Sequence, residues 1–499
     1  MLQATGSHAG KTVLVAGLCR LLARRGLRVR PFKSQNMSLN AAVAVAGGEM
    51  GWAQVMQAEA AGVPARVEMN PILLKPRAEA RSQVVLLGQV LGEADAVGYY
   101  RLTPRLWPAV RRSYETLARE ADVVVIEGAG SPAEPNLMRR DLANMRVARL
   151  ARAPVLLVGD IDRGGVFASL LGTMTLLPPA DRRRVRGFLI NKFRGDASLL
   201  APAVRDLVRR TRVPVVGVVP FLPRLGLPEE DSVALDAAAP AARGGLRVAV
   251  VRLPHIANFT DFAPLEAEPG VELVYAEEPA ALAGAALVVL PGSKDTIADL
   301  RALKARGFVA ALAEHRARGG LVLGVCGGYQ MLGRAVADPN RVESGGEEAG
   351  LGLLPVATTL GREKITRRVR ARWRPDGPGF EGYEIHVGVT VGDGPTRPLL
   401  DVEGHTAAAA VARPPHGMDW REEGCASADG RVWGTHLHGL FESGPARRHV
   451  LDWARGAPAV AGAPAPPDHR ALREAAYDRL ADALADALDE QLLSDLGVS

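Results

Sequence analysis

Residues 321–332, LVLGVCGGYQML, join an apolar run to the start of a helical pattern through a cysteine flanked by glycines. An apolar run of this kind is typical of a strand buried on both faces of a parallel sheet. A strand that turns at once into a helix strains the backbone at the corner, which Gly324, Gly327 and Gly328 make tolerable. The stretch predicts that Cys326 is exposed at the sheet edge, where the helix N-terminus favours its thiolate. A small buried cysteine that fills a tight corner is the alternative.

Apolar runs recur through the chain, separated by Ala-, Arg- and Leu-rich stretches with a helical pattern. The other runs are ADVVVIEGAG (121–130), APVLLVGDID (153–162), VRGFLINKF (185–193), VPVVGVVP (213–220), LRVAVVRLP (246–254) and AALVVLPGS (285–293). Strands without apolar–polar alternation need helices on both faces of their sheet. The sequence therefore predicts an α/β fold with doubly wound parallel sheets.

The length of 499 residues exceeds the size at which a single hydrophobic core stops growing, so at least two domains are expected. The strand–helix alternation lapses over GLPEEDSVALDAAAPAARGG (226–245), an acidic and then Ala/Pro/Gly-rich stretch typical of a linker. We expect domains at 1–228 and 246–457, with the linker at 229–245. Residues 458–499 read as a Pro- and Ala-rich connection followed by an amphipathic helix.

The composition is that of an ordinary globular protein, with 47% hydrophobic and 23% charged residues. The formal net charge of +6 is mild, and arginine is not gathered into a block with interleaved aromatics. Nucleic acid is therefore not an expected partner, and a polyanionic small substrate fits the charge at least as well. Three widely separated cysteines suit a reducing compartment. With no run near about 20 apolar residues and no leader pattern, we expect a cytoplasmic protein without a membrane partner.

Residues 3–22, QATGSHAGKTVLVAGLCRLL, place Gly10, Lys11 and Thr12 at the opening of a helical pattern. The backbone N–H groups of such a loop hold phosphate, the lysine neutralises its charge, and the threonine hydroxyl reaches Mg²⁺. These three residues predict an ATP site with Thr12 as a metal ligand. A glycine before a capped helix is the alternative. Ala4 stands where the longer form of the loop has its first glycine, and only three residues remain for a preceding strand, which indicates a truncated or misassigned start.

Polar residues follow three of the predicted strands. Glu127 ends one strand, Asp160, Asp162 and Arg163 follow the next, and Asn191 closes another. In an open parallel sheet, ligands gather beyond the carboxyl ends of the strands, so Glu127 is a candidate metal ligand. Asn191 is a candidate for reading an adenine edge. Solvated strand ends and turn residues are the alternatives.

RVWGTHLHGLFES (431–443) supplies two candidate bases for the predicted thiol, His436 and His438, after another apolar-flanked segment. A cysteine nucleophile needs an imidazole within hydrogen-bond reach.

Several longer motifs resemble the cobyric acid synthases, glutamine-dependent amidases of corrinoid biosynthesis. The motifs are PFKSQNMSLN (31–40), QAEAAGV (57–63), MNPILLKP (69–76), EGAGSPAEPNL (127–137) and DIDRGGVFA (160–168). The resemblance covers nearly the whole chain. It implies an N-terminal P-loop NTPase-like domain, similar to dethiobiotin synthetase, and a C-terminal type 1 (class I) glutamine amidotransferase-like domain.

The resemblance also suggests residues for the ATPase half. Lys33 becomes a second cation near the transferred phosphate, beside Lys11. The candidates for substrate contact are Asn36, Ser38, Asn40, Glu59, Asp160, Asp162 and Arg163. Capping or turn roles are the alternative for each.

For the second half, the resemblance assigns the nucleophile to Cys326 and the base to His438. The family has an aromatic residue where this chain has His436, so a core or hydrogen-bonding role is expected there. Leu440 occupies the position of the usual triad glutamate, and the spacing of Glu442 gives it no support, so another group must orient His438.

Two further motifs match the family, LPGSKD (290–295) and FEGYEIHVG (380–388). The first implies that the N–H groups of Gly292 and Gly327 hold the oxyanion. The second implies only support of the site.

The implied reaction is the ATP- and glutamine-dependent amidation of the b, d, e and g carboxylates of adenosylcobyrinic acid a,c-diamide, giving adenosylcobyric acid for cobalamin. Glutamine and the corrinoid are then the substrates, with ATP and Mg²⁺. Two alternatives stay open: the sister amidase that acts on the a and c carboxylates, and a nucleotide switch of the partitioning-ATPase type.

Overall fold

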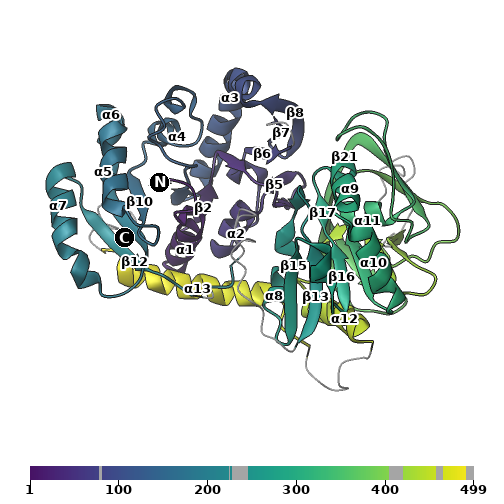
Figure 1. Ribbon diagram of the computed structural model, residues 1–499. Coiled ribbons are helices and arrows are strands. Elements are labelled where there is room, and N and C mark those ends of the chain that lie inside the picture. The colour runs from purple at the N-terminus through teal and green to yellow at the C-terminus, as the bar shows by residue number, and fades with distance from the viewer. Residues whose placement is uncertain (78–80, 224, 228–244, 404–419, 457–464, 490–499) are drawn as a thin grey trace. The chain divides into compact units, whose positions relative to one another are not determined.

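The computed structural model describes residues 1–77, 81–223, 225–227, 245–403, 420–456 and 465–489 (Figure 1). The chain forms two compact units. The first comprises Met1–Ser38, Ala44–Glu230 and Arg473–Ser499, and the second Leu39–Val43 and Asp231–Leu472.

A four-stranded parallel sheet lies at the centre of the first unit, in the order β1 (Leu2–Ala4), β10 (Val155–Asp160), β11 (Val185–Phe193), β12 (Val215–Pro220). A parallel pair, β2 (Val29–Phe32) and β9 (Val123–Ile126), extends it through a bridge between Leu2 and Glu127. All of these strands run in the same direction, so their carboxyl ends share one edge of the sheet.

Helices cover both faces of this sheet. On β10, Leu156 and Val158 pack with α1 (Lys11–Arg24), while Val155 and Leu157 pack with α5 (Val166–Leu176). The other helices of these two layers are α2 (Trp52–Ala60), α4 (Met145–Leu150), α7 (Ala201–Thr211) and part of α13 (His469–Ala487). Because side chains alternate between the faces of a strand, a strand buried on both faces must be apolar throughout.

The first unit also contains a smaller sheet that the apolar runs did not predict. Strand β3 (Gln35–Met37) pairs parallel with β6 (Ile72–Pro76), which continues antiparallel into β7 (Arg81–Leu86) and β8 (Gln89–Asp95). Helix α3 (Ala96–Glu120) follows, and the Asp95 carboxylate caps it by accepting the Gly98 N–H at 2.6 Å. Leu106, Val110 and other residues of α3 pack in a separate core with this sheet.

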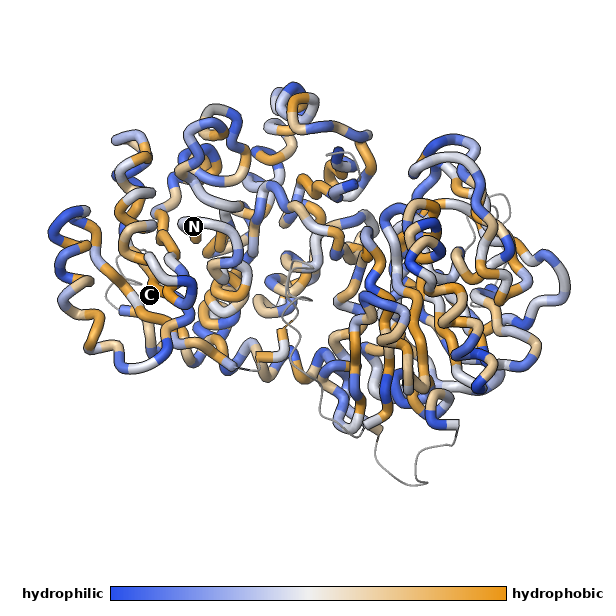
Figure 2. Tube along the Cα trace, viewed as in Figure 1, coloured by the Kyte–Doolittle hydropathy of each residue, from blue (hydrophilic) through white to orange (hydrophobic). Residues whose placement is uncertain are grey.

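The second unit has a six-stranded sheet in the order β15 (Val271–Ala276), β13 (Leu246–Val251), β16 (Leu287–Leu290), β18 (Leu321–Val325), β26 (Val432–Thr435), β25 (Cys425–Ala426). All but β25 are parallel. Helices α9 (Thr296–Ala305), α10 (Phe308–Ala317) and α11 (Gly327–Leu332) cover one face, and α12 (Gly444–Arg455) the other. Figure 2 shows the hydrophobic colouring along these strands.

A second, mixed sheet adjoins this core. Its long hairpin of β21 (Val356–Trp373) and β22 (Gly379–Gly392) joins β27 (Leu437–His438) on one side and β19 (Ala335–Asp338) and β20 (Gly346–Ala349) on the other. Two further strands, β23 (Leu400–Glu403) and β24 (Trp420–Glu423), pair beyond β21. The register sets Tyr383 directly opposite His438.

The predicted α/β class with doubly wound parallel sheets is confirmed. Residues 229–244 of the predicted linker, and residues 458–464 and 490–499 of the predicted C-terminal segment, lie outside the described part of the chain. The predicted C-terminal helix forms as α13, and from Arg473 onward it belongs to the first unit. Its Tyr477, Leu480 and Leu484 are buried in the same core as α1.

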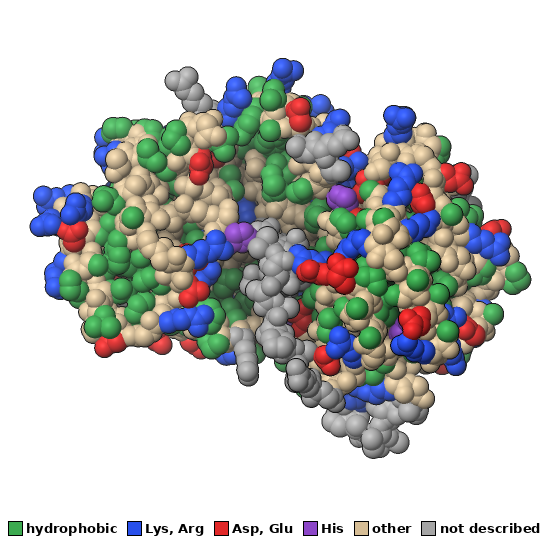
Figure 3. Space-filling view, viewed as in Figure 1, with side chains coloured by type: hydrophobic (Ala, Val, Ile, Leu, Met, Phe, Trp, Pro, Cys, Tyr) green, Lys and Arg blue, Asp and Glu red, His purple; other side chains and the backbone are tan. Residues whose placement is uncertain are grey.

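Among the described residues, no helix combines the length and apolar character needed to cross a bilayer. On the face seen in Figure 3, acidic and basic side chains are interspersed.

Candidate active sites

Cys326 lies at the corner between β18 and α11, as the sequence predicts. Its backbone angles, φ 52° and ψ −110°, fall in a region that side chains rarely adopt, so the predicted strain is confirmed. A Cβ at Gly328 would lie 2.0 Å from the Leu290 carbonyl oxygen, and one at Gly324 would lie 2.7 Å from the Tyr329 nitrogen. The corner therefore requires both glycines, because a side chain at either position would collide with backbone atoms.

The expectation of an exposed thiol was wrong. Cys326 is only 7% exposed, and its Sγ lies 3.5 Å from the Ile385 carbonyl oxygen on β22. The mixed sheet covers the thiol, a layer that the strand–turn–helix pattern alone does not reveal. The Cys326 N–H donates to the Thr435 carbonyl at 2.7 Å, which fixes the corner against β26.

His438, on β27, is buried beside this thiol, at 1% exposure. Its Nδ1 lies 2.5 Å from Oδ2 of Asp261. Burial by itself would lower the pKa of His438, but the charge and hydrogen bond of Asp261, together with the hydrogen bond and charge of Cys326, raise it to about 10. The imidazolium form of His438 is therefore favoured at neutral pH.

Sequence reasoning missed Asp261. It lies in a 3₁₀ turn, Phe259–Phe262, that follows the short strand β14 (Ile256–Ala257), 177 positions before His438. No spacing rule links the two residues. Leu440, at the usual position of the triad glutamate, is buried in the core. The carboxylate of Glu442 lies 3.6 Å from Nδ1 of His469.

Two further side chains hold the His438 ring. Tyr383 stacks on it, with ring centroids 5.1 Å apart, and its hydroxyl donates to Oδ1 of Asp261 at 3.4 Å. The Asn258 amide nitrogen lies 3.4 Å from Nε2 of His438, and its Oδ1 accepts the N–H of Ala41, in the same unit, at 3.0 Å. Tyr383, from the FEGYEIHVG motif, therefore contacts both His438 and Asp261, which is the supporting role expected of that motif.

The two glycines predicted for the oxyanion lie at this site. Strand β17 (Gly292–Ser293) pairs with β14, and a Cβ at Gly292 would lie 3.4 Å from Cε1 of His438. Gly327 follows Cys326 and packs against Ser293, where a Cβ would lie 2.8 Å from the backbone nitrogen. The structure therefore brings Gly292 and Gly327 together around the nucleophile; their oxyanion role stays a prediction.

His436 is anchored away from this chemistry. Its Nδ1 lies 3.2 Å from Glu423, its Nε2 lies 3.1 Å from Thr390, and its ring stacks on His386 at 4.2 Å. These contacts fit the hydrogen-bonding role expected for His436.

The predicted phosphate loop lies at the start of α1. Gly10 has φ 86°, and the Lys11 Nζ donates to the carbonyl oxygens of Gly6 at 3.0 Å and Gly130 at 3.3 Å. Asn191, considered for an adenine edge, donates its amide to the Ala9 carbonyl at 2.9 Å. It therefore braces the loop from β11.

Glu127 is the centre of a buried polar cluster beside the loop. Oε1 accepts the Thr12 hydroxyl at 2.8 Å and lies 2.9 Å from the Lys33 Nζ. Oε2 accepts the Gln57 amide at 2.5 Å. Glu127 is 1% exposed, and these partners offset the cost of burying a polar group there. Gln57, the first residue of the QAEAAGV motif, was not predicted.

A magnesium ion fits these donors. The Thr12 hydroxyl and the Glu127 carboxylate are hard oxygen ligands that converge beside the loop. The metal would screen the charge of bound phosphates.

The remaining candidates are held in several environments. Asp160 pairs with Lys192 at 2.9 Å and lies 3.9 Å from Arg163, while Asp162 pairs with Arg194 at 3.1 Å. Lys192 also donates to the His8 carbonyl of the loop at 2.8 Å, so Asp160 is connected to the phosphate site.

The candidates from the first motifs are dispersed. The Asn36 side-chain amide donates a hydrogen bond to Oε1 of Gln54 at 3.1 Å. Ser38 is buried, and its backbone N–H donates to the Leu74 carbonyl oxygen. Asn40 belongs to the second unit. Glu59 accepts hydrogen bonds from Arg473 and Tyr477 of α13, each at 3.0 Å, and thus has structural partners.

The fold and the two sites define an enzyme class, a carbon–nitrogen ligase that joins a nucleotide-binding domain to a glutamine amidotransferase domain. Residues 1–234 match the CobQ/CobB/MinD/ParA nucleotide binding domain, and residues 247–446 match the CobB/CobQ-like glutamine amidotransferase domain. The chain belongs to the cobyric acid synthase family.

Three relatives bear this out. The cobyric acid synthase of Desulforudis audaxviator is 50% identical and aligns with 99% of this chain and 98% of its own. That of Sorangium cellulosum is 48% identical over 99% of this chain and 97% of its own. That of Rhizobium rhizogenes is 49% identical over 99% of both chains.

Proposed function

We propose that this chain uses ATP and glutamine to amidate the b, d, e and g carboxylates of adenosylcobyrinic acid a,c-diamide, giving adenosylcobyric acid. The observation that carries the proposal is the strained Cys326 beside a His438 that Asp261 holds at 2.5 Å. It supports release of ammonia from glutamine. The Glu127 cluster beside the phosphate loop supports activation of a carboxylate by ATP. The names of the relatives point to the corrinoid.

In the glutaminase half, the Cys326 thiolate attacks the side-chain amide carbon of glutamine. The N–H groups of Gly292 and Gly327 stabilise the oxyanion, a contribution of about 3 kcal/mol per donor. The His438 imidazolium gives its proton to the departing nitrogen, which leaves as ammonia and a thioester remains. Neutral His438 then takes a proton from water, which hydrolyses the thioester to glutamate. Asp261 holds the ring in place and stabilises its charged form.

In the synthetase half, a substrate carboxylate oxygen attacks the γ-phosphorus of ATP, giving an acyl phosphate and ADP. Ammonia then attacks the acyl carbon, and phosphate leaves. Phosphoryl transfer of this kind depends mostly on positioning and on neutralising charge. Lys11 and Lys33 supply positive charge, while Thr12 and Glu127 would hold the metal.

The decisive experiment supplies purified protein with the a,c-diamide, ATP and glutamine. We expect one glutamate and one ADP for each amide formed, and adenosylcobyric acid as the final product. Consumption of cobyrinic acid at its a and c carboxylates would favour the sister amidase instead. Absence of glutamate release would favour a nucleotide switch.

Cys326→Ala separates the two halves. It should abolish synthesis from glutamine yet leave synthesis from ammonium measurable, because the thiol only makes ammonia. Cys425→Ala, at another buried cysteine, is the matched control. Loss of both activities in a folded Cys326→Ala protein would contradict this division of labour.

A further inference from the structure

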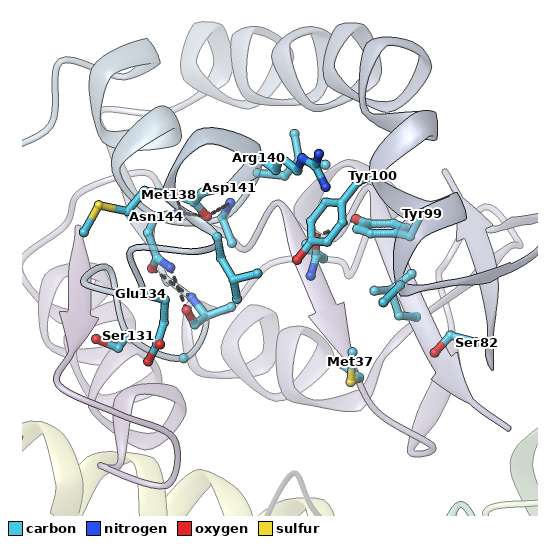
Figure 4. Close-up of a pocket in the computed structure, with 18 of the residues that line it drawn as sticks. Met37, Ser82, Tyr99, Tyr100, Ser131, Glu134, Met138, Arg140, Asp141 and Asn144 are labelled. Carbon is cyan, nitrogen blue, oxygen red and sulfur yellow. Dashed lines mark hydrogen bonds between the residues drawn. The ribbon is translucent and has the colours of Figure 1, made fainter. Parts of the chain in front are cut away.

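A pocket of about 370 Å³ lies in the first unit, next to the phosphate loop. The segment that follows Glu127 forms one wall, from Ala129 to Asn144, and β3, β7 and the start of α3 form the other. Figure 4 shows Ser131, Glu134 and Asn144 on one side of this space and Tyr99 and Tyr100 on the other. None of these residues belongs to the Glu127 cluster.

The lining is largely apolar and its rim is open. Met37 is 53% exposed and Leu137 is 38% exposed, and both line the pocket with Leu74 and Val84. Large apolar side chains gathered around a cavity favour a ligand with an apolar surface.

Arg140 lies in the lining of this pocket and carries a positive charge. The Arg140 guanidinium lies over the Tyr100 ring, 5.1 Å from its centroid, and within the described residues it forms no ion pair. In Figure 4 its side chain lies beside Tyr100. An exposed guanidinium on an aromatic face can bind a carboxylate with two hydrogen bonds.

The loop wall is braced and joined to the phosphate site. Asn144 donates to the Ala129 carbonyl at 2.7 Å and accepts the Ala129 N–H at 3.1 Å. The carbonyl oxygen of the next residue, Gly130, accepts a hydrogen bond from the Lys11 Nζ at 3.3 Å. A ligand in this pocket therefore lies beside the lysine of the phosphate loop.

We propose that this pocket binds one edge of the corrinoid substrate, with its apolar surface on Tyr100, Met37 and Leu137 and a peripheral carboxylate on Arg140. A corrin carries apolar ring edges and several carboxylate arms, which is the combination that this lining offers. A ligand held here could direct another carboxylate arm toward Lys11. The inference rests on the function proposed above and gives its substrate a site.

The test compares two corrinoids that differ in charge, the a,c-diamide and its product cobyric acid, in which the b, d, e and g carboxylates have become amides. Each is titrated into wild type, Arg140→Gln and Leu137→Ser, with corrin absorbance as the readout. Arg140→Gln should weaken binding of the a,c-diamide about tenfold and leave the amidated corrinoid nearly unchanged. Binding of the a,c-diamide to Arg140→Gln should also depend less on salt concentration than its binding to wild type. Leu137→Ser should weaken both corrinoids alike.

Matched controls are Arg183→Gln and Leu199→Ser, at exposed positions outside the pocket lining. Both should bind like wild type. The KM for ATP and the glutaminase activity should be unchanged in all four variants. If wild type makes cobyric acid while Arg140→Gln and Leu137→Ser bind both corrinoids normally, the pocket assignment fails and the proposed function stands. If wild type amidates no corrinoid, the proposed function fails and this inference with it.

Discussion

Oδ2 of Asp261 lies 2.5 Å from Nδ1 of His438, although 177 positions of sequence separate the two residues. Two residues after His438, where the resemblance pointed to the usual position of a triad glutamate, this chain has Leu440. The carboxylate that contacts His438 comes instead from the turn after β14. A side chain from either place can reach Nδ1, because the requirement is on the position of the carboxylate and not on its order in the chain.

Asp261→Asn should lower glutaminase activity by about 10³-fold or more, because the amide cannot stabilise the imidazolium. Initial rates of glutamate release check this. Glu442→Gln, which changes an acid close to His438 in sequence, is the control and should retain activity.

The same variant should show a defined pH dependence of stability. The pKa of His438 is raised from near 6.5 to about 10 in the folded state, so its protonation stabilises the fold fully below about pH 6.5 and less as pH rises through about 10. The difference in unfolding free energy between wild type and Asp261→Asn should therefore shrink from pH 6.5 to pH 10. Urea unfolding at several pH values measures it. A constant difference over that range would show that Asp261 does not pair with the imidazolium.

His438→Ala and His436→Ala should have different consequences. The first removes the proton donor and should nearly abolish thioester formation in a rapid-quench experiment with glutamine. The second breaks contacts to Glu423 and Thr390, and should lower the melting temperature while thioester formation persists. Equal kinetic defects at the two positions would leave no basis for assigning the base to His438.

Lys11→Ala should remove ATP-dependent amidation and leave basal glutaminase activity. The Lys11 Nζ donates to the carbonyl oxygens of Gly6 and Gly130, which both belong to the first unit, whereas Cys326 and His438 belong to the second. ADP formation with the a,c-diamide and ammonium isolates the synthetase step. Unchanged ADP formation in this variant would exclude Lys11 from the phosphate site.

Lys33→Met should destabilise the first unit by about 3–5 kcal/mol, because it leaves the buried Glu127 carboxylate without its cation. In a Glu127→Gln background, Lys33→Met should lower the free energy of unfolding by at least about 1 kcal/mol less than it does in wild type. Denaturant unfolding of the four proteins gives the coupling energy. Additive effects would mean that the two side chains do not stabilise each other.

The sequence predicts well what depends on local pattern. The apolar runs predict the parallel strands, and the glycines around Cys326 predict the strained corner that is observed at φ 52°. The clustering of Lys11, Thr12, Lys33 and Glu127 follows from their places at one edge of the sheet.

Features that depend on distant pairing could not be predicted in this way. Strands β21 and β22 alternate polar and apolar residues, and no local signal shows that they fold over Cys326 and bury it. Asp261 approaches His438 only because the turn after β14 and the strand β27 meet in the fold. Gln57 and Glu59 share one motif, yet Gln57 reaches Glu127 while Glu59 reaches Arg473, since residues two apart on a helix face different directions.

The return of α13 to the first unit bears on how this enzyme can be divided for study. Tyr477, Leu480 and Leu484 form part of the core that surrounds α1, and Tyr477 and Arg473 bind the Glu59 carboxylate. A fragment cut at the apparent boundary near residue 230 would expose that apolar surface and leave Glu59 without these partners. An isolated synthetase half should therefore be built with residues 473–489 supplied, either as a fused tail or as a separate peptide.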